Sequence, residues 1–364
     1  MYVIGKTGTG KSTLLETLAT QDVLHGRGMM LIDPHGDLAE RVMQAVPAHR
    51  RDDVIYFNVP DPTQPFGYNP LKHVREDKIS LVASGLLEAF KKMWPDAWGV
   101  RMEHVLRNTL LTLLEQPAAT LADILKLLDD KSFRAAAVAR IRNEQVRQFW
   151  TTEYDHYPAR LRAEAIAPIQ NKVGAFLADP TLRRVLTSPE KPLQIRRIMD
   201  EGKILIVNLA RGQLGEDTTA LLGALLVTTA VLAAFSRAEV EPAERRPFFV
   251  YLDEFQSFTT RSLANMTAEL RKYGIGVVAA HQYLTQVEPP VIDAVLGNAG
   301  TIICFRLGPN DAAAMAREFE PKLEAIDLLN LPNHEIYVKL MIDGAPSQPF
   351  SASTLGPSDR FSEN

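Results

Sequence analysis

Eight consecutive residues near the start of the chain have the types and spacing of a phosphate-binding loop. They fit G-x-x-x-x-G-K-[ST] without a mismatch, and the run is Gly5-Lys6-Thr7-Gly8-Thr9-Gly10-Lys11-Ser12. The glycines let the backbone turn tightly, so that successive N–H groups can point at phosphate oxygens. In such a loop Lys11 reaches the β- and γ-phosphates, and the hydroxyl of Ser12 binds Mg²⁺. The sequence therefore predicts a site for ATP and Mg²⁺ formed by these eight residues and Thr13.

The residues on either side of this loop support the same interpretation. Met1–Ile4 is a short apolar strand, and residues 11–25 are predicted to form a helix whose positive N-terminal end faces the phosphates. A chance glycine-rich turn would need neither element. A dinucleotide-binding fingerprint, suggested by Gly8, Gly10 and Asp33, fails because Thr13 stands at the third glycine position.

An acidic pair far along the chain completes the predicted chemistry. Asp253 and Glu254 directly follow the apolar run Phe248–Leu252. Because the carboxyl ends of parallel strands meet at one edge of a sheet, Asp253 is expected beside Ser12 despite the roughly 240 residues between them. There Asp253 would hold Mg²⁺ through a water, and Glu254 would polarise the water that attacks the γ-phosphate. The alternative is a solvated helix start.

Two further residues are candidates for the same reaction. Gln282 follows the predicted strand 276–280 and should hydrogen-bond the γ-phosphate or the attacking water, the alternative being a capping side chain. Arg271, on a predicted helix over 263–273, is a candidate arginine finger for a neighbouring subunit's site. Arg306, at a strand end, is its rival, and a surface salt bridge is the alternative for either arginine.

A third acidic cluster is interpreted as a turn. Asp33, His35 and Asp37 follow the predicted strand 29–33, and Asp-Pro and His-Gly-Asp are sequences that form tight strand–helix connections. We therefore do not assign a metal site to them.

The spacing of apolar residues predicts how these segments are positioned. Strands and helices alternate over the first 59 residues and again from residue 203, which predicts an α/β fold with a mainly parallel sheet covered by helices. Between about residues 71 and 193 no strand pattern is found, and helical periodicity predicts an inserted all-α domain. The predicted division is 1–70 and 199–355 for the nucleotide-binding domain, 71–198 for the insertion, and 356–364 for a disordered tail.

Two other segments bear on topology. Residues 335–342 and 348–354 are predicted to close the domain as an antiparallel hairpin. Thr218–Ser236 is uncharged and close to membrane-spanning length, but it follows a strand in an α/β pattern, so a fully buried helix is the better interpretation.

Overall composition limits the function classes. The chain has 364 residues, a formal net charge of −4 and one cysteine, Cys304. It is therefore not a basic nucleic-acid coat, and any DNA must be bound through a local patch or an assembled channel. One cysteine excludes an intramolecular disulfide and a multi-cysteine metal site. The first strand begins almost at residue 1, which we interpret as a fragment, or a short version, of something longer at the N-terminus.

Several motifs together resemble the HerA/FtsK superfamily of hexameric DNA-pumping ATPases. These are residues 4–12, 31–37, 251–255, 270–274 and 280–282. Within that superfamily the chain is most similar to the conjugative coupling proteins of type IV secretion systems, of the TraG/TrwB type, which carry an all-α domain inserted in a RecA-like domain. Residues 205–210 and 297–299 also fit their pattern. The similarity is weakest across the helical insertion.

The resemblance implies a homohexameric ring, ATP bound between subunits, and single- or double-stranded DNA in a central channel. It also implies a cytoplasmic location at the inner face of a bacterial membrane, next to secretion machinery. The membrane-spanning helices of coupling proteins do not occur here, so either an N-terminal region is missing or the chain is a soluble relative. The loop from Phe258 to Arg261 and the turn 211–213 are expected to be exposed and carry cations that could face DNA in the channel. The segments 183–184 and 196–197 could do likewise, and a solvated basic face is the alternative for each.

Two other functions remain open at this level. The first is a secretion ATPase that moves protein with no DNA in its channel. The second is a nucleotide-gated assembly scaffold or switch with slow hydrolysis. DNA-stimulated ATP turnover and salt-sensitive DNA binding would distinguish the DNA motor from both.

Overall fold

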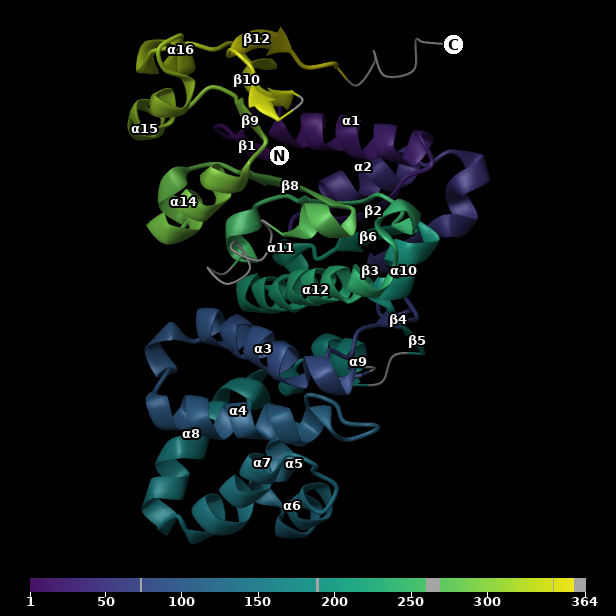
Figure 1. Cartoon of the computed structure of the whole chain (residues 1–364), viewed down its shortest axis with the longest axis vertical. Coiled ribbons are helices and arrows are strands. Elements are labelled where there is room, and N and C mark those ends of the chain that lie inside the picture. The colour runs from purple at the N-terminus through teal and green to yellow at the C-terminus, as the bar shows by residue number, and fades with distance from the viewer. Residues whose placement is uncertain (73, 188–189, 260–268, 343, 357–364) are drawn as a thin grey trace. The chain divides into compact units, whose positions relative to one another are not determined.

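The computed structural model describes residues 1–72, 74–187, 190–259, 269–342 and 344–356. The chain forms two compact units (Figure 1). The α/β unit comprises Met1–Asn58, Ile195–Leu214 and Ala233–Asn364, and the helical unit comprises Val59–Gln194 and Gly215–Leu232.

A ten-stranded sheet, counted over the described residues, is the centre of the α/β unit. Its order is β11-β10-β9-β1-β8-β7-β2-β6-β3, and β12 pairs with β10. The strands from β9 to β3 in this order are all parallel, which confirms the predicted mainly parallel sheet. The strands are β1 (Tyr2–Ile4), β2 (Gly28–Asp33), β3 (Val54–Asn58), β6 (Ile204–Asn208), β7 (Phe248–Leu252), β8 (Ile275–His281), β9 (Thr301–Cys304), β10 (Glu335–Ile342), β11 (Ala345–Pro346) and β12 (Phe350–Ser353).

The predicted C-terminal hairpin forms as β10 and β12, which pair antiparallel, and β10 also pairs antiparallel with β9. Helices α1 (Lys11–Leu24) and α2 (Asp37–Ala45) pack on one face of the sheet, where Leu15, Val23 and Leu38 join a core with strand residues such as Leu31. Burial of this apolar surface is the main stabilising contribution to the unit. The other α-helices among the described residues of the unit are α10 (Ile195–Glu201), α11 (Arg211–Leu214), α14 (Pro289–Asn298), α15 (Pro309–Phe319) and α16 (Ala325–Leu329).

The segment after β7 differs in part from the sequence-based expectation. Most of the helix expected over 263–273 lies outside the described residues, and the described part, Leu270–Tyr273, is a 3₁₀ turn. Phe258 was expected in an exposed loop, and this was wrong, because its side chain is fully buried. Burial of a phenyl ring stabilises the loop and removes Phe258 from any surface.

The helical unit consists of short helices packed around α4, together with most of α12. Its described elements are α3 (Ile79–Met93), α4 (Val100–Leu114), α5 (Asp123–Asp129), α6 (Lys131–Val138), α7 (Glu144–Gln148), the π-helical turn η4 (Phe149–Glu153), α8 (Ala159–Ala178), α9 (Pro180–Thr187) and α12 (Glu216–Ser236). Gly85 of α3 lies so close to α12 that a Cβ there would be 2.7 Å from Thr228 Cγ2. Tyr68 also donates a hydrogen bond to the carbonyl of Leu225 at 3.2 Å.

Two details of the helical unit differ from the sequence-based expectation. Residues 216–232 of α12 belong to this unit, although the helix was expected within the nucleotide-binding domain. A two-stranded parallel ladder, β4 (Phe66–Gly67) with β5 (Lys191–Pro192), lies partly in the stretch where no strand was expected. Strands of two residues show no alternation, so the pattern could not reveal them.

The apolar helix is the one described segment long and apolar enough to cross a membrane, over Glu216–Glu239. In the structure 72% of its apolar window is buried against the rest of the chain. This burial fits a core helix, as expected.

Candidate nucleotide-binding and hydrolysis site

The loop between β1 and α1 has the backbone of a phosphate cradle. Gly8 and Gly10 have φ angles of 76° and 115°, which side-chain-bearing residues rarely adopt. Gly10 is the N-cap of α1 and offers no side chain to the first N–H groups of the helix. These N–H groups therefore point outward as donors for an anion.

Lys11 is held inside this loop. Its side chain is 6% exposed, and Nζ donates to the carbonyls of Gly5 at 2.5 Å and Lys6 at 3.1 Å. Burial lowers the pKa of Lys11, while the charges of Glu254 and Asp253 oppose that shift. The ammonium group thus lies where phosphate oxygens could replace the loop carbonyls as its partners.

The acidic pair lies at the same edge of the sheet as the loop. Strands β1, β8 and β7 are adjacent and parallel, so their carboxyl ends converge. Ser12 Oγ lies 3.5 Å from Asp253 Oδ2, across 241 residues of sequence. The structure therefore brings together the two groups expected to hold Mg²⁺.

The surroundings of Asp253 fit a divalent cation. The side chain is 5% exposed, and burial, followed by the charges of Asp33 and Glu254, raises its pKa to about 7. Carboxylates crowded in a buried site repel one another, and a bound cation offsets that repulsion. Carboxylate and hydroxyl oxygens are also the ligands that Mg²⁺ prefers. The residues present thus fit Mg²⁺ with ATP.

Glu254 is fixed from two sides by amides. Its Oε1 accepts a hydrogen bond from Gln282 Nε2 at 2.5 Å, and its Oε2 accepts one from Gln256 Nε2 at 2.6 Å. Gln282 Oε1 in turn accepts a hydrogen bond from Thr7 Oγ1 at 2.7 Å. A chain of hydrogen bonds therefore links the phosphate loop, Gln282 after the end of β8, and the acidic pair.

The backbone at Glu254 supports a functional assignment. Its φ of 50° is left-handed, and the side chain is 6% exposed. Non-glycine residues in this conformation carry strain that is common at active sites. Thr7 was predicted as a residue of the phosphate loop, but its bond to Gln282 was not expected. Gln256 was not predicted, and the available signal was its position two residues after Glu254.

A cluster of aromatic side chains joins β1, β8 and the turn after β7. His281 is fully buried, its Nε2 lies 2.5 Å from the hydroxyl of Tyr2, and its ring centroid is 4.9 Å from that of Phe255. Burial, and then the charge of Lys11, lowers the pKa of His281 to about 3, so its imidazole is neutral. The first residue of β1, the last residue of β8 and Phe255 of the turn after β7 thereby pack together.

The C-terminal hairpin also reaches the phosphate loop. His334 has a φ of 68°, and its N–H donates to the carbonyl of Thr9 at 2.9 Å. A Cβ placed on Gly10 would lie 2.8 Å from His334 Nδ1. Nothing in the sequence near His334 pointed to this contact.

The two arginine candidates have different environments. Arg306 donates to the carbonyl of Leu331 at 3.3 Å and to Asn333 Oδ1 at 2.8 Å, so its guanidinium is used within the chain. Arg271 is exposed, and its side chain makes no hydrogen bond or ion pair within the described part of the chain. It lies before the first residue of β8, whereas Gln282 lies after the last. A strand of seven residues spans about 23 Å, so Arg271 lies too far away to reach its own chain's acidic pair.

The Asp33 turn is explained by backbone hydrogen bonds. Asp33 is fully buried and accepts from the N–H of His35 at 2.8 Å and of Ala39 at 2.9 Å. Over the ranges that the structure describes, no group of three or more His, Cys, Asp or Glu side chains is placed to hold a metal ion.

The basic segments proposed for DNA have mixed environments. Arg184 donates to the carbonyls of Asp61, Pro62 and Gln64 at 2.9–3.0 Å, so it fixes a loop of the helical unit. Arg196 and Arg197 pair with Asp200 and Glu201 at 2.5 Å. Arg183, Gly212 and Gln213 are exposed and Arg211 is half-buried, whereas Thr260 and Arg261 lie outside the described residues.

Comparisons with known proteins agree with this fold. A family model described as the type IV secretion-system coupling protein DNA-binding domain matches residues 1–320. A comparison with curated proteins found no match.

Solved structures with the same fold include bacterial conjugative coupling protein TrwBdeltaN70 in an unbound form, at a TM-score of 0.69 and 16% identity over 97% of this chain and 84% of that one. Plasmid coupling protein TrwB in complex with ADP and Mg²⁺ matches at 0.66 and 19% over the same shares. VirB4 of Thermoanaerobacter pseudethanolicus matches at 0.65 and 14%, over 98% and 90%. The RecA-like fold with an inserted helical part is thereby confirmed. Because the family model covers most of its length, the chain belongs to the family of the type IV secretion-system coupling protein DNA-binding domain.

Proposed function

We propose that the chain is an ATP-hydrolysing motor that translocates DNA, of the conjugative coupling type. The observation that carries this proposal is the convergence of the phosphate loop, Asp253-Glu254 and Gln282 on one sheet edge. A phosphate loop alone binds nucleotide, whereas a carboxylate held beside it by an amide supplies the means to activate water.

The roles of the residues follow from their positions. Lys11 and the loop N–H groups bind the phosphates, and Ser12 with Asp253 would hold Mg²⁺, which neutralises phosphate charge when bound. Glu254 accepts the proton of the attacking water, and Gln282, bonded to Glu254, orients that water. Gln282 bonds both Thr7 and Glu254, so it links the loop that binds phosphate to the carboxylate that activates water.

We further propose a homohexamer in which Arg271 completes the site of a neighbouring subunit. Its exposure, its lack of a partner within the described residues and its distance from its own acidic pair support action between subunits. DNA would pass through the ring and contact cations such as the half-buried Arg211, and secretion machinery at the inner face of the membrane would be the partner. The family description, a DNA-binding domain of secretion coupling proteins, supports both partners.

The test is ATP turnover and ATP binding by Glu254→Gln. The amide keeps the size of the side chain but cannot accept a proton, so turnover should fall at least about a hundredfold while ATP affinity stays within a fewfold. Full turnover in this variant would show that the assigned chemistry is wrong.

A further inference from the structure

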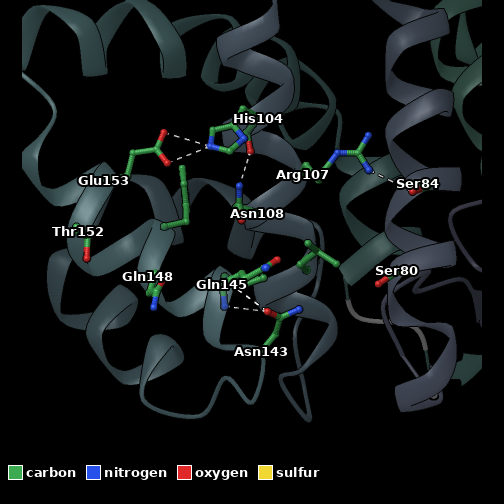
Figure 2. A pocket seen from close by; sticks show the side chains of 13 residues that line it. Ser80, Ser84, His104, Arg107, Asn108, Asn143, Gln145, Gln148, Thr152 and Glu153 are labelled. Atoms are coloured by element: carbon green, nitrogen blue, oxygen red, sulfur yellow. Dashed lines mark hydrogen bonds and ion pairs between the residues drawn. The ribbon is translucent and has the colours of Figure 1, made fainter.

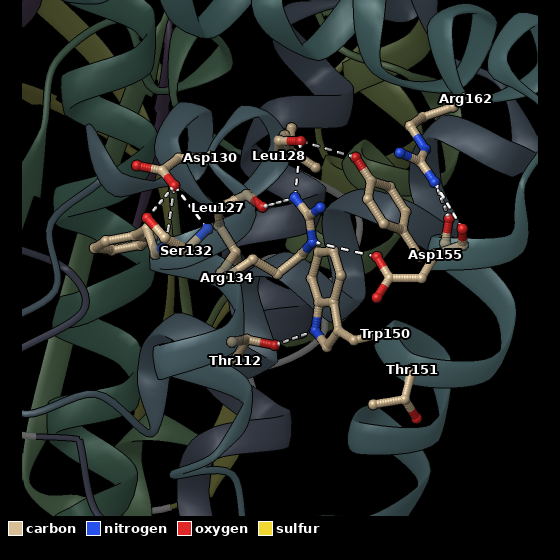
Figure 3. Close-up of polar contacts among 12 residues, drawn as sticks. Thr112, Leu127, Leu128, Asp130, Ser132, Arg134, Trp150, Thr151, Asp155 and Arg162 are labelled. Atoms are coloured by element: carbon tan, nitrogen blue, oxygen red, sulfur yellow. Dashed lines mark hydrogen bonds and ion pairs between the residues drawn. The ribbon is translucent and has the colours of Figure 1, made fainter.

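Two clusters of polar side chains in the helical unit form bonds within that unit. In the pocket lined by α3, α4 and η4, His104 pairs with Glu153 at 3.2 Å (Figure 2). In the second cluster Arg134 donates to the carbonyls of Leu127 and Leu128 at 3.0 and 3.1 Å (Figure 3). These bonds hold short helices together, so the packing of the unit accounts for them.

Packing does not account for the position of His334 in the α/β unit. Its side chain is exposed, yet its ring lies against the phosphate loop. A Cβ on Gly10 would lie 2.8 Å from Nδ1 and 3.4 Å from Cε1 of His334, so this edge of the ring occupies the space that the missing side chain of Gly10 leaves free. The rest of the imidazole is accessible to a ligand bound at the loop.

The backbone holds His334 in this place. Its N–H donates to the carbonyl of Thr9 at 2.9 Å, and its carbonyl accepts from the N–H of Thr354 at 2.8 Å and from Thr354 Oγ1 at 3.1 Å. Its φ of 68° is left-handed, and strained backbone of this kind is common where ligands are held. Three hydrogen bonds thus fix the backbone that carries an exposed ring, which lowers the entropic cost of binding.

The preceding residue connects the same segment to the phosphate loop by a second route. Asn333 Oδ1 accepts a hydrogen bond from Arg306 Nη2 at 2.8 Å. The carbonyl of Arg306 in turn accepts from the N–H of Lys6 at 2.9 Å. The segment before β10 is therefore bonded to the phosphate loop directly at Thr9 and through Arg306 at Lys6.

The strand order places His334 and the acidic pair on opposite sides of the phosphate loop. In the sheet β1 lies between β9 and β8, and β7 lies beyond β8. Asp253-Glu254 follows β7, whereas His334 precedes β10, which is antiparallel to β9 and so begins at the same edge. The γ-phosphate must lie at the acidic pair for water to be activated there. The other end of the nucleotide, with its sugar and base, is thus directed toward the side where His334 lies.

The base suits the imidazole ring better than the phosphates do. The phosphate oxygens already have Lys11 and the N–H groups at the start of α1 as donors. A base is flat and has an aromatic face on which a histidine ring can stack. Stacking needs no particular hydrogen-bonding edge of the base, so one accessible ring is sufficient.

We propose that His334 is a nucleotide-binding residue whose imidazole stacks on the base of the bound nucleotide. The inference rests on the proposed ATP site and extends it from the triphosphate to the base. It gives the segment before β10 a part in binding that the phosphate loop and the acidic pair do not perform.

The test compares two ligands that share a triphosphate but differ in the presence of a base. Isothermal titration measures the affinities of a non-hydrolysable ATP analogue and of inorganic tripolyphosphate, each with Mg²⁺, for the wild type and for His334→Asn. Asparagine tolerates a left-handed φ, so the segment should keep its shape. We expect the variant to bind the ATP analogue at least about fivefold more weakly, because stacking on the base is lost, and to bind tripolyphosphate with unchanged affinity.

His49→Asn is the matched control. His49 is exposed, and its 3₁₀ helix η1 (Ala48–Asp53) precedes β3, at the opposite edge of the sheet. Equal losses for both ligands in His334→Asn would show that His334 only shapes the phosphate loop, and an unchanged affinity for the ATP analogue would show that it makes no contact. Either result overturns the proposal while the ATP site stands. A wild type that binds neither ligand would overturn the ATP site and this proposal with it.

Imidazole signals in nuclear magnetic resonance spectra provide a second measurement on the unchanged chain. The signals of His334 in ring-labelled protein are identified by their loss from the spectrum of His334→Asn. They should shift when the ATP analogue is added, through the ring current of the base, and should stay in place with tripolyphosphate. Shifts of the same size with both ligands would overturn the assignment of the base.

Discussion

Ser12 and Asp253 lie side by side although 241 residues separate them, with Ser12 Oγ 3.5 Å from Asp253 Oδ2. Neighbouring parallel strands produce this contact, because β1 and β7 both end at the same edge on either side of β8. The helical unit interrupts the chain between β1 and β7, yet both strands lie in the same sheet. The phosphate loop and the acidic pair therefore lie next to each other.

Lys11→Ala should weaken ATP binding by about tenfold to a hundredfold, because a charge-assisted contact to the phosphates is removed. Isothermal titration with a non-hydrolysable ATP analogue measures this. Lys131→Ala is the control, since Lys131 is an exposed lysine of α6 and lies outside the loop. Equal losses in the two variants would contradict the role of Lys11.

Gln282→Ala should lower kcat roughly a hundredfold with little change in ATP affinity, because the amide that positions Glu254 is lost. Single-turnover and steady-state assays separate the two effects. Thr7→Val, which removes the bond at the other side of Gln282, should have a much smaller effect on kcat. A Gln282 variant that changes only affinity would place this residue in binding, not in hydrolysis.

Arg271→Ala should lose about a thousandfold or more in kcat while still binding ATP. An equimolar mixture of Arg271→Ala with Glu254→Gln should recover part of the turnover. In that mixture some sites combine an intact Glu254 of one subunit with an intact Arg271 of the next. Turnover that stays at the level of the separate variants would exclude action between subunits.

His281 should make the α/β unit less stable in acid. Its pKa is lowered to about 3 in the folded state, against about 6.5 when unfolded, so the stabilisation is complete above pH 6.5 and is lost as pH falls below it. Titration of this group lowers the free energy of unfolding by about 1.4 kcal/mol for each pH unit, or by about 2 kcal/mol between pH 6.5 and 5.

Urea unfolding across this pH range measures the free energy of unfolding for the wild type and for His281→Gln. The glutamine keeps a polar partner for Tyr2 but does not titrate, so its curve should be flatter by that slope. Parallel curves would show that His281 is not the responsible group.

Much of the fold could be predicted because its signals are local. The loop of residues 5–12, the apolar strands and the C-terminal hairpin each carry their pattern within a few residues. The placement of Asp253 followed from one rule about parallel strands, and the structure shows this arrangement.

Other features depend on contacts that no local pattern records. Residues of α12 are apolar on every side, so nothing in the helix indicated that residues 215–232 pack in the helical unit. The position of Arg306 at a strand end made it a candidate arginine finger, and its bonds to Leu331 and Asn333 are visible only in the structure. The bonds of Gln256 and Thr7 to the site are likewise visible only in three dimensions.

The most direct test of the DNA motor is steady-state ATP turnover of the full chain, without DNA and with single- or double-stranded DNA, over a salt series. The account predicts that one form of DNA accelerates turnover manyfold, that the stimulation fades as salt rises, and that Glu254→Gln abolishes it. Turnover that is slow and unchanged by either DNA at low salt would contradict the account and favour a protein-moving ATPase or a nucleotide-gated scaffold.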